Sequence, residues 1–187
     1  LVRQIAFDKT GTLTEGHPRV HEVEAVLGDT DALLALAAAA EAASEHPLAE
    51  AVVKAAFDAQ LTPPDAESFE ATPGKGVTAR INGANVLIGS PRFLTEAGVD
   101  LKPSGHRIGE LEGRGRTVVA VARDGQLLGH LALGDALRDG AEETLESLRA
   151  AGVRTVLITG DNRRTALRVA EELGLDEVHA EVLPGDK

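Results

Sequence analysis

The sequence predicts an α/β protein in which a parallel-sheet domain is interrupted by an inserted α+β domain. Near both ends of the chain, short apolar runs alternate with helix-length segments, a pattern typical of βαβ units and a parallel sheet. In the middle, Asn82-Gly83 and Asp124-Gly125 each separate two apolar runs, which is a strong signal for β-hairpins. The middle block therefore forms a second domain, inserted after the first strand.

The elements of both domains follow from hydrophobic periodicity and from glycine and proline punctuation. In the parallel-sheet domain we expect a strand over 1–7, a helix over 139–151, a strand over 153–158, a helix over 162–173 and a short strand over 177–180. In the inserted domain we expect helices over 30–43 and 47–59 and antiparallel strands over 77–81, 84–88, 117–122 and 126–133, with the helices on one face. Connections near 17–22 and 132–135 would join the two domains.

Composition excludes several classes of function. The 187-residue chain carries a net charge of −11, which disfavours nucleic acid and anionic lipid as partners. There is no Cys, and the six His are scattered, so we expect neither a disulfide nor a transition-metal site. The longest apolar stretch, 32–43, is shorter than the roughly 20 residues of a membrane span, so this segment should make no direct membrane contact. The chain has no Met and begins inside a strand, which suggests a piece of a longer protein.

Polar groups from three distant segments are predicted to meet at one edge of the parallel sheet. Asp8 follows the first strand, Thr159-Gly160-Asp161-Asn162 follows the strand over 153–158, and Lys187 follows the last short strand. Ligands of open parallel sheets bind outside the carboxyl ends of the strands. Taken singly, the segment 159–162 is also explained as a turn and helix N-cap, and Lys187 as a surface lysine. Their common location favours a site.

Such an edge suits phosphoryl transfer. A carboxylate such as Asp8 can attack a phosphoryl group, and lysine, hydroxyl and amide donors with Mg²⁺ can neutralise the phosphate. Many phosphatases of this design carry a second Asp two positions after the nucleophile as general acid and base, but this chain has Thr10 there. Hydrolysis of the aspartyl phosphate should therefore be slow, which favours coupling to movement over simple hydrolysis.

The motifs DKTGT at 8–12, TGDN at 159–162 and LPGDK at 183–187 together resemble the P-type ATPases, whose phosphorylation domain has a haloacid-dehalogenase-like fold. SEHPL at 44–48 and GKGV at 74–77 resemble the nucleotide-binding domain of the heavy-metal-transporting branch. The resemblance covers essentially the whole chain. It implies a phosphorylation domain at 1–18 and 133–187 and a nucleotide-binding domain at 19–132.

The resemblance also implies roles for individual residues. Asp8 would be phosphorylated by ATP, and its carboxylate and the Thr10 carbonyl would bind Mg²⁺. The other implied catalytic residues are Lys9, Thr159, Gly160 and Lys187 around the phosphoryl group, and Asp161, which closes the site around nucleotide. Asp135-Ala136-Leu137-Arg138 resembles the family's Asp-x-x-Arg hinge motif.

In the inserted domain, the resemblance implies a nucleotide site made of Glu41, His46, Gly74, Gly76, Val77, Gly89 and Ser90. Glycines let a backbone approach a flat ring closely, although a plain loop explains them too. His46 precedes Pro47 at an expected helix start, so it is equally an ordinary boundary residue. Copper transporters of the family have Gly-Asn where this chain has Gly89-Ser90, which favours zinc, cadmium or cobalt as the transported metal.

The family's GDGxND segment, whose Asp completes the Mg²⁺ site, and its transmembrane and actuator domains are not in this sequence. We therefore expect a monomeric fragment that binds ATP or ADP weakly and phosphorylates Asp8 poorly, from the cytoplasmic face of a transporter in the plasma or inner membrane. Two alternatives remain open: a soluble haloacid-dehalogenase-like phosphatase with a large cap domain, and a non-catalytic nucleotide-binding module.

Overall fold

The computed structural model describes residues 2–160 and 163–182, so the expected site residues Asp161 and Lys187 lie outside the described part. The chain divides into two compact units. The first comprises 1–17, 113–115 and 135–187, and the second comprises 18–112 and 116–134. In the chain, the first unit is interrupted by the second, as the sequence pattern predicts.

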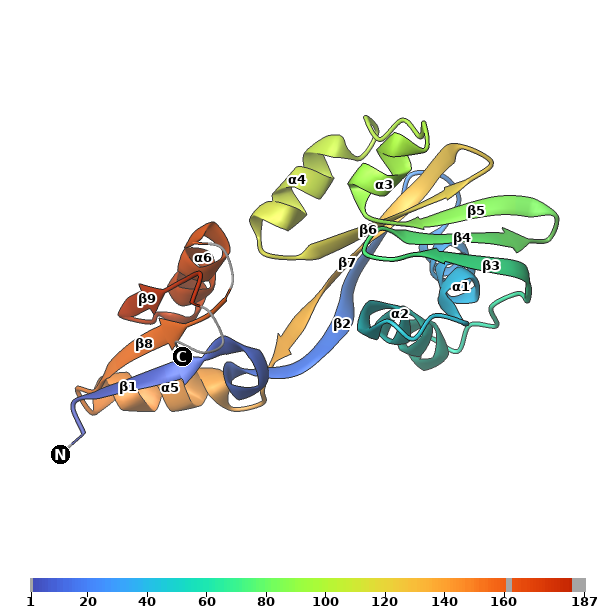
Figure 1. Cartoon of the computed structure of the whole chain (residues 1–187). Helices are drawn as coiled ribbons and strands as arrows, with labels where there is room; N and C mark the ends of the chain where they lie inside the picture. The colour runs from blue at the N-terminus through green and yellow to red at the C-terminus, as the bar shows by residue number, and fades with distance from the viewer. Residues whose placement is uncertain (1, 161–162, 183–187) are drawn as a thin grey trace. The chain divides into compact units, whose positions relative to one another are not determined.

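The first unit contains a three-stranded sheet in the order β1-β8-β9, formed by Gln4–Asp8, Arg154–Ile158 and Glu177–His179. Both strand pairs are parallel, which confirms the predicted parallel sheet. Helices α5 (Ala141–Ala150) and α6 (Arg163–Leu173) pack against β8 and β9 respectively (Figure 1). Their apolar side chains, including Leu145 and Ala170, enclose a small core around Leu157.

The second unit contains a six-stranded sheet in the order β2-β7-β6-β5-β4-β3. Its strands are β2 (Thr14–Ala25), β3 (Ala66–Thr72), β4 (Gly76–Ile81), β5 (Ala84–Gly89), β6 (Thr117–Arg123) and β7 (Gln126–Leu137). The registers from β3 to β7 are antiparallel, as predicted. The predicted hairpin turns are also present, because Asn82, Gly83, Asp124 and Gly125 all have positive φ, as a type I′ turn requires.

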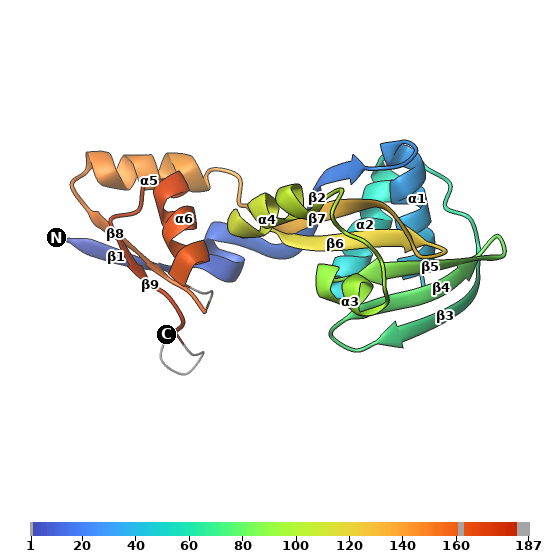
Figure 2. The ribbon, with the colours of Figure 1, turned by 90° about the horizontal axis from the view of Figure 1, so that it is seen from above.

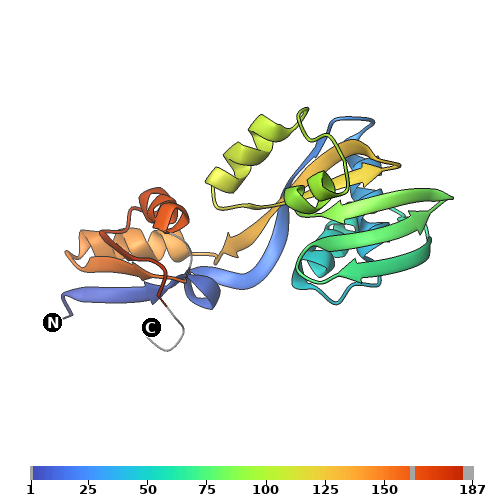
Figure 3. The ribbon, with the colours of Figure 1, turned by 45° about the horizontal axis from the view of Figure 1, so that its top comes forward.

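Helices cover both faces of this sheet (Figures 1 and 3). The two predicted helices share one face, as expected, while two helices that were not predicted cover the other. Helices α1 (Thr30–Glu41) and α2 (Pro47–Asp58) lie over one face, where Val121 and Leu131 enter their core. Helices α3 (Pro91–Glu96) and α4 (Gly105–Gly113) contact residues that alternate with these along the strands. Ala120 clusters with Leu94 of α3, and Ala132 clusters with Ile108 of α4.

The sequence patterns predict neither two of the strands, β2 and β3, nor two of the α-helices, α3 and α4. Strand β3 is an edge strand in which most side chains are exposed, so it carries little apolar alternation. Helix α3 has only six residues, too few for a helical period to be recognised. Apart from the short stretch 113–115, the chain passes between the two units along β2 and along β7, and not through separate loops (Figure 2).

None of the helices in the described ranges has both the length and the apolar character that spanning a membrane would require.

Candidate functional site

Asp8 lies at the carboxyl edge of the parallel sheet of the first unit. It is the last residue of β1, and its register partner is Ile158, the last residue of β8. Thr159 follows directly, is 1 % exposed, and is held by two backbone hydrogen bonds: its N–H donates to the His179 carbonyl, and its carbonyl accepts from Val182. The Asp8 and Thr159 segments therefore occupy the ends of neighbouring strands.

A single π-helical turn, Lys9–Leu13, follows Asp8 and carries Thr10. Gly11 adopts a left-handed φ of +79°, which glycine tolerates without strain. The turn closes where the Thr14 N–H donates to the Lys9 carbonyl. This single turn therefore separates Asp8, at the end of β1, from Thr14, at the start of β2.

Asp135, from the end of β7, holds the chain just after this turn. Its carboxylate accepts a hydrogen bond from the Thr14 hydroxyl and another from the Gly16 N–H, at 3.0 Å. The Thr14 hydroxyl also accepts from the Gly11 N–H at 3.3 Å. Thr14 is 4 % exposed, so these contacts form a buried polar link between β7 and the turn.

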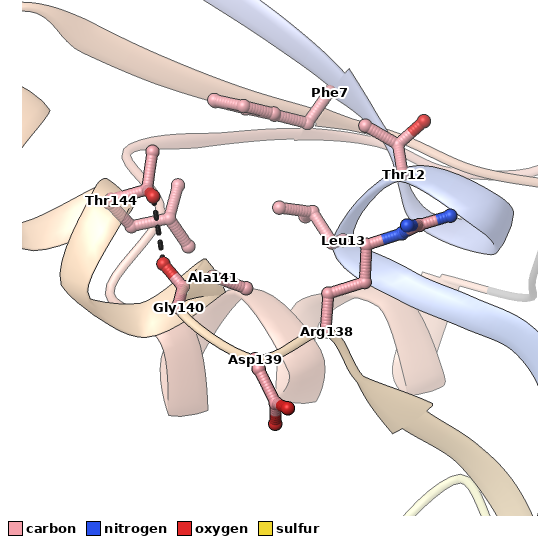
Figure 4. A pocket seen from close by; sticks show the side chains of 9 residues that line it. Phe7, Thr12, Leu13, Arg138, Asp139, Gly140, Ala141 and Thr144 are labelled. Carbon is pink, nitrogen blue, oxygen red and sulfur yellow. Dashed lines mark hydrogen bonds between the residues drawn. The ribbon is translucent and has the colours of Figure 1, made fainter.

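Arg138 holds the other side of the same turn. Its Nη2 donates to the Gly11 carbonyl at 2.9 Å and its Nε donates to the Thr14 carbonyl at 3.2 Å. In Figure 4 the Arg138 side chain reaches toward Leu13 and Thr12 of the turn. These residues and the start of α5 line a pocket of about 180 Å³, whose other lining residues are Phe7, Asp139, Gly140, Ala141, Thr144 and Leu145.

The oxygen donors beside Asp8 fit Mg²⁺ in kind, because Mg²⁺ prefers hard oxygen ligands such as a carboxylate and a peptide carbonyl. Among the described residues there is no group of three or more His, Asp or Glu side chains suited to a metal ion. A carboxylate such as that of Asp8 and a peptide carbonyl such as that of Thr10 would supply only part of the oxygen ligands that Mg²⁺ takes.

A second polar cluster lies in the second unit, between the end of α1 and the start of α2. Glu41 is 9 % exposed, and burial raises the pKa of its carboxyl group, while a hydrogen bond from Ser44 and the nearby His46 act in the opposite direction. His46 is the N-cap of α2: its Nδ1 accepts from the Leu48 N–H at 3.2 Å. In the neutral ring the proton is then on Nε2.

Glu41 and Ser44 also line a pocket of about 410 Å³. Its opposite wall is one face of α2, formed by Glu50, Val53, Lys54 and Phe57. The Phe57 ring is 79 % exposed, an unusual fraction for a phenylalanine. The pocket thus combines one buried carboxyl group with a wall of both apolar and charged side chains.

The glycines of the expected nucleotide site are required by the fold for different structural reasons. Gly76 and Gly89 are register partners on β4 and β5. A Cβ on Gly76 would lie 2.3 Å from the Ile88 carbonyl oxygen, and one on Gly89 would lie 2.4 Å from that of Lys75. Gly74 has a φ of +72° in an open turn, where an added Cβ would meet nothing. Close backbone packing therefore requires two of the glycines, and backbone conformation favours the third.

The remaining expected residues also have structural contacts. Val77 is 4 % exposed, and its side chain packs in the core under α1 and α2. Ser90 is the N-cap of α3, its Oγ accepting from the Phe93 N–H at 3.2 Å. Asn is an equally good N-cap, so the Ser90 position has the same structural role with either residue.

The chain belongs to the haloacid dehalogenase-like hydrolase family, which it matches over residues 2–187. The relatives it matches are heavy-metal P-type ATPases. It is 42 % identical over 186 residues to the copper-exporting P-type ATPase of Legionella pneumophila, and 46 % identical over 188 residues to the zinc/cadmium/lead-transporting P-type ATPase of Escherichia coli. Each alignment covers 100 % of this chain and 25 % of the relative, so the chain spans a quarter of their length.

The structure resembles the crystal structure of a zinc-transporting PIB-type ATPase in its E2.Pi state, with a TM-score of 0.90 and 45 % sequence identity. The match covers 99 % of this chain and 30 % of that one. Both units are therefore included in the likeness.

Sequence reasoning missed the roles of two residues that the structure places at these sites. Thr14 links the turn after Asp8 to Asp135, and Ser44 lies between Glu41 and His46. Thr14 ends the stretch DKTGTLT at 8–14, which extends the motif DKTGT, and Ser44 begins the motif SEHPL. The available signal was a hydroxyl within a motif, but the sequence does not show which groups that hydroxyl contacts. Asp135, the partner of Thr14, is distant in sequence, and the neighbours of Ser44 depend on the turn between α1 and α2.

Proposed function

We propose that this chain is the ATP-binding and phosphorylation region of a P-type ATPase that transports a heavy-metal cation. The first unit is the phosphorylation domain and the second is the nucleotide-binding domain. The observation that carries the proposal is the register of β1 and β8, because it sets Asp8 beside the Thr159 segment at the carboxyl edge of the sheet.

Asp8 is the nucleophile of the proposed reaction. A carboxylate oxygen attacks the γ-phosphorus of ATP, the bond from that phosphorus to the β–γ bridging oxygen breaks, and ADP leaves with the electron pair. The Thr159 hydroxyl and the Gly160 N–H, on the neighbouring strand end, hold the phosphoryl oxygens. Lys9, Asp161 and Lys187 complete the proposed set, the last two from outside the described residues.

Asp8 and the Thr10 carbonyl would hold Mg²⁺, which supplies neutralisation of the phosphate charge when bound. The two residues are two positions apart: Asp8 ends β1, and Thr10 lies in the turn Lys9–Leu13 that follows. A threonine at position 10 provides no general acid or base, so the aspartyl phosphate should persist long enough to drive a conformational change.

The Glu41–Ser44–His46 cluster is the proposed recognition site for the nucleobase. A carboxyl group and an imidazole N–H are suitable partners for the amino group and ring nitrogens of adenine. Gly74, Gly76, Val77, Gly89 and Ser90 would form the backbone wall of the same site. Their packing between β4, β5 and α3 makes that wall rigid.

Zinc, cadmium or cobalt is the proposed cargo. Ser90 in place of the asparagine of copper transporters supports this assignment, while the relatives include transporters of both copper and zinc. The chain would then face the cytoplasm in a transporter of the plasma or inner membrane.

Radiolabelling tests this function in the full-length protein that carries the chain. With ATP labelled in the γ-phosphate and Mg²⁺, we expect an acid-stable, hydroxylamine-sensitive phosphoenzyme that Asp8→Asn abolishes. Zn²⁺ or Cd²⁺, and not Cu⁺, should stimulate ATP hydrolysis. Asp31→Asn, an exposed carboxylate on α1, is the control and should label normally.

Two outcomes would contradict the proposal. Labelling that survives Asp8→Asn would show that another residue is phosphorylated. Rapid turnover of small phosphate esters, with no phosphoenzyme from ATP, would instead support the soluble phosphatase.

A further inference from the structure

The peptide group between Thr10 and Gly11 is held by the Thr14 side chain. The Gly11 N–H donates to the Thr14 hydroxyl at 3.3 Å. The Gly11 carbonyl, which belongs to the next peptide group, accepts a hydrogen bond from Arg138 at 2.9 Å. Both peptide groups that flank the Gly11 Cα are therefore fixed by side chains from outside the turn.

Peptide planarity extends this restraint to the Thr10 carbonyl. The Thr10 carbonyl and the Gly11 N–H belong to one peptide group, which is planar and trans, as all peptide bonds of the described chain are. In a trans peptide the C=O and N–H bonds point in opposite directions. A hydrogen bond that fixes the Gly11 N–H thus also fixes the direction of the Thr10 carbonyl.

Gly11 makes this restraint necessary. Glycine has the largest conformational freedom of any residue, and Gly11 has a left-handed φ of +79° with open space at its Cβ position. Local sterics alone therefore leave its neighbouring peptide groups free to rotate. The side-chain contacts of Thr14 and Arg138 remove that freedom.

The proton of the Thr14 hydroxyl has a defined acceptor. The Lys9 carbonyl lies 3.0 Å from the hydroxyl but already accepts the Thr14 backbone N–H that closes the turn. The Asp135 carboxylate is closer, and as an anion it is the stronger acceptor. Donation to Asp135 leaves a lone pair of the hydroxyl directed to the Gly11 N–H.

We propose that Thr14 is a positioning residue: its hydroxyl, oriented by Asp135, fixes the Thr10–Gly11 peptide group and so the direction of the Thr10 carbonyl, the oxygen that the proposed function assigns to Mg²⁺. The inference rests on that proposed function. In this proposal Thr14 is not itself a ligand of substrate or metal, and it acts through the peptide group.

Two substitutions separate the hydroxyl from the shape of the side chain. Thr14→Val keeps the shape and loses the hydroxyl, and Thr14→Ser keeps the hydroxyl. Thr144→Val is the matched control, because the exposed Thr144 makes only a local hydrogen bond to the Gly140 carbonyl of its own helix.

The first measurement needs no metal. In amide hydrogen-exchange NMR of the whole chain, the Gly11 amide should be protected in the wild type and in Thr14→Ser. In Thr14→Val, loss of one hydrogen bond should speed its exchange by about five- to tenfold. An unprotected Gly11 amide in the wild type, or equal exchange in Thr14→Val, would overturn the inference. The wild-type measurement decides even if Thr14→Val does not fold.

The second measurement uses Mn²⁺ as a paramagnetic substitute for Mg²⁺. Broadening of the Gly11 resonance should need about five- to tenfold more Mn²⁺ in Thr14→Val than in the wild type, Thr14→Ser or Thr144→Val. Equal titrations of Thr14→Val and the wild type would overturn the inference. No broadening in a wild type whose Gly11 amide is protected would instead contradict the metal site of the proposed function.

Discussion

Glu41 shows two environmental effects on a single carboxyl group. Burial raises its pKa above the ordinary value of 4.5, while the hydrogen bond from Ser44 and the charge of His46 lower it. Because burial has the largest effect, the folded state holds the proton more tightly than the unfolded state does. The protonated, neutral form of Glu41 is therefore the one that the fold favours.

This shift predicts a pH dependence of stability. A raised folded pKa means that the folded state binds more protons between 4.5 and that pKa, so stability should fall as the pH rises through this window. Glu41→Gln should remove this fall and should unfold at a higher urea concentration than the wild type near neutral pH. Urea unfolding followed from about pH 4 to about pH 8 measures both effects.

Glu50→Gln is the matched control, because Glu50 lines the same pocket but is exposed. It should keep the wild-type pH profile. An unchanged profile in Glu41→Gln would contradict the role of burial.

At the scale of elements, β4 and β5 depend on two facing glycines. Gly76→Ala would place a methyl group 2.3 Å from the Ile88 carbonyl oxygen and 2.7 Å from the Gly89 Cα, both backbone atoms. Backbone can relieve such an overlap only by moving the strands apart. We expect a loss of about 1–3 kcal/mol in the free energy of unfolding, measured by urea denaturation.

Gly105→Ala is the control for this loss. Gly105 begins α4, and an added Cβ there meets nothing within 4 Å. That variant should be as stable as the wild type or slightly more stable, since Ala favours helix over Gly. Equal stability of Gly76→Ala and the wild type would refute the packing explanation.

Sequence patterns predicted those elements whose backbone conformation is determined by a few neighbouring residues. Asn82-Gly83 and Asp124-Gly125 form hairpin turns because these residue pairs accept positive φ, and His46-Pro47 begins α2 as a cap followed by proline. Strand β3 escaped recognition because pairing with β4, and not apolar alternation, makes it a strand. The helices on the second sheet face escaped recognition because their short apolar faces become evident only against β6 and β7.

At the scale of the whole molecule, the second unit occupies one continuous stretch of chain, 18–134, apart from 113–115. It has its own sheet and its own core, so we expect the excised segment 18–134 to fold independently. ATP should shift the His46 resonances equally in the segment and in the whole chain, as measured by NMR titration. His46→Ala lacks these resonances, so its Ser44 amide serves as the reporter and should need more ATP to shift, both in the segment and in the whole chain.

An unfolded spectrum of the excised segment would contradict this independence. A folded segment whose His46 signals ignore ATP would contradict the proposed nucleotide site instead. The first unit offers no such test by simple excision, because its strands come from both ends of the chain.

The sequence by itself determined the fold class, the family and the motif residues of this protein, because strand and helix periods, turn dipeptides and DKTGT with TGDN are local patterns. Tertiary structure alone decided what those residues contact. Thr14 lies 121 positions from Asp135 and 124 positions from Arg138 in the sequence, yet it is hydrogen-bonded to both. Gly76 faces Gly89 only because β4 pairs with β5. Burial, distance and hydrogen-bond partners depend on atoms brought together by packing, which no local pattern encodes.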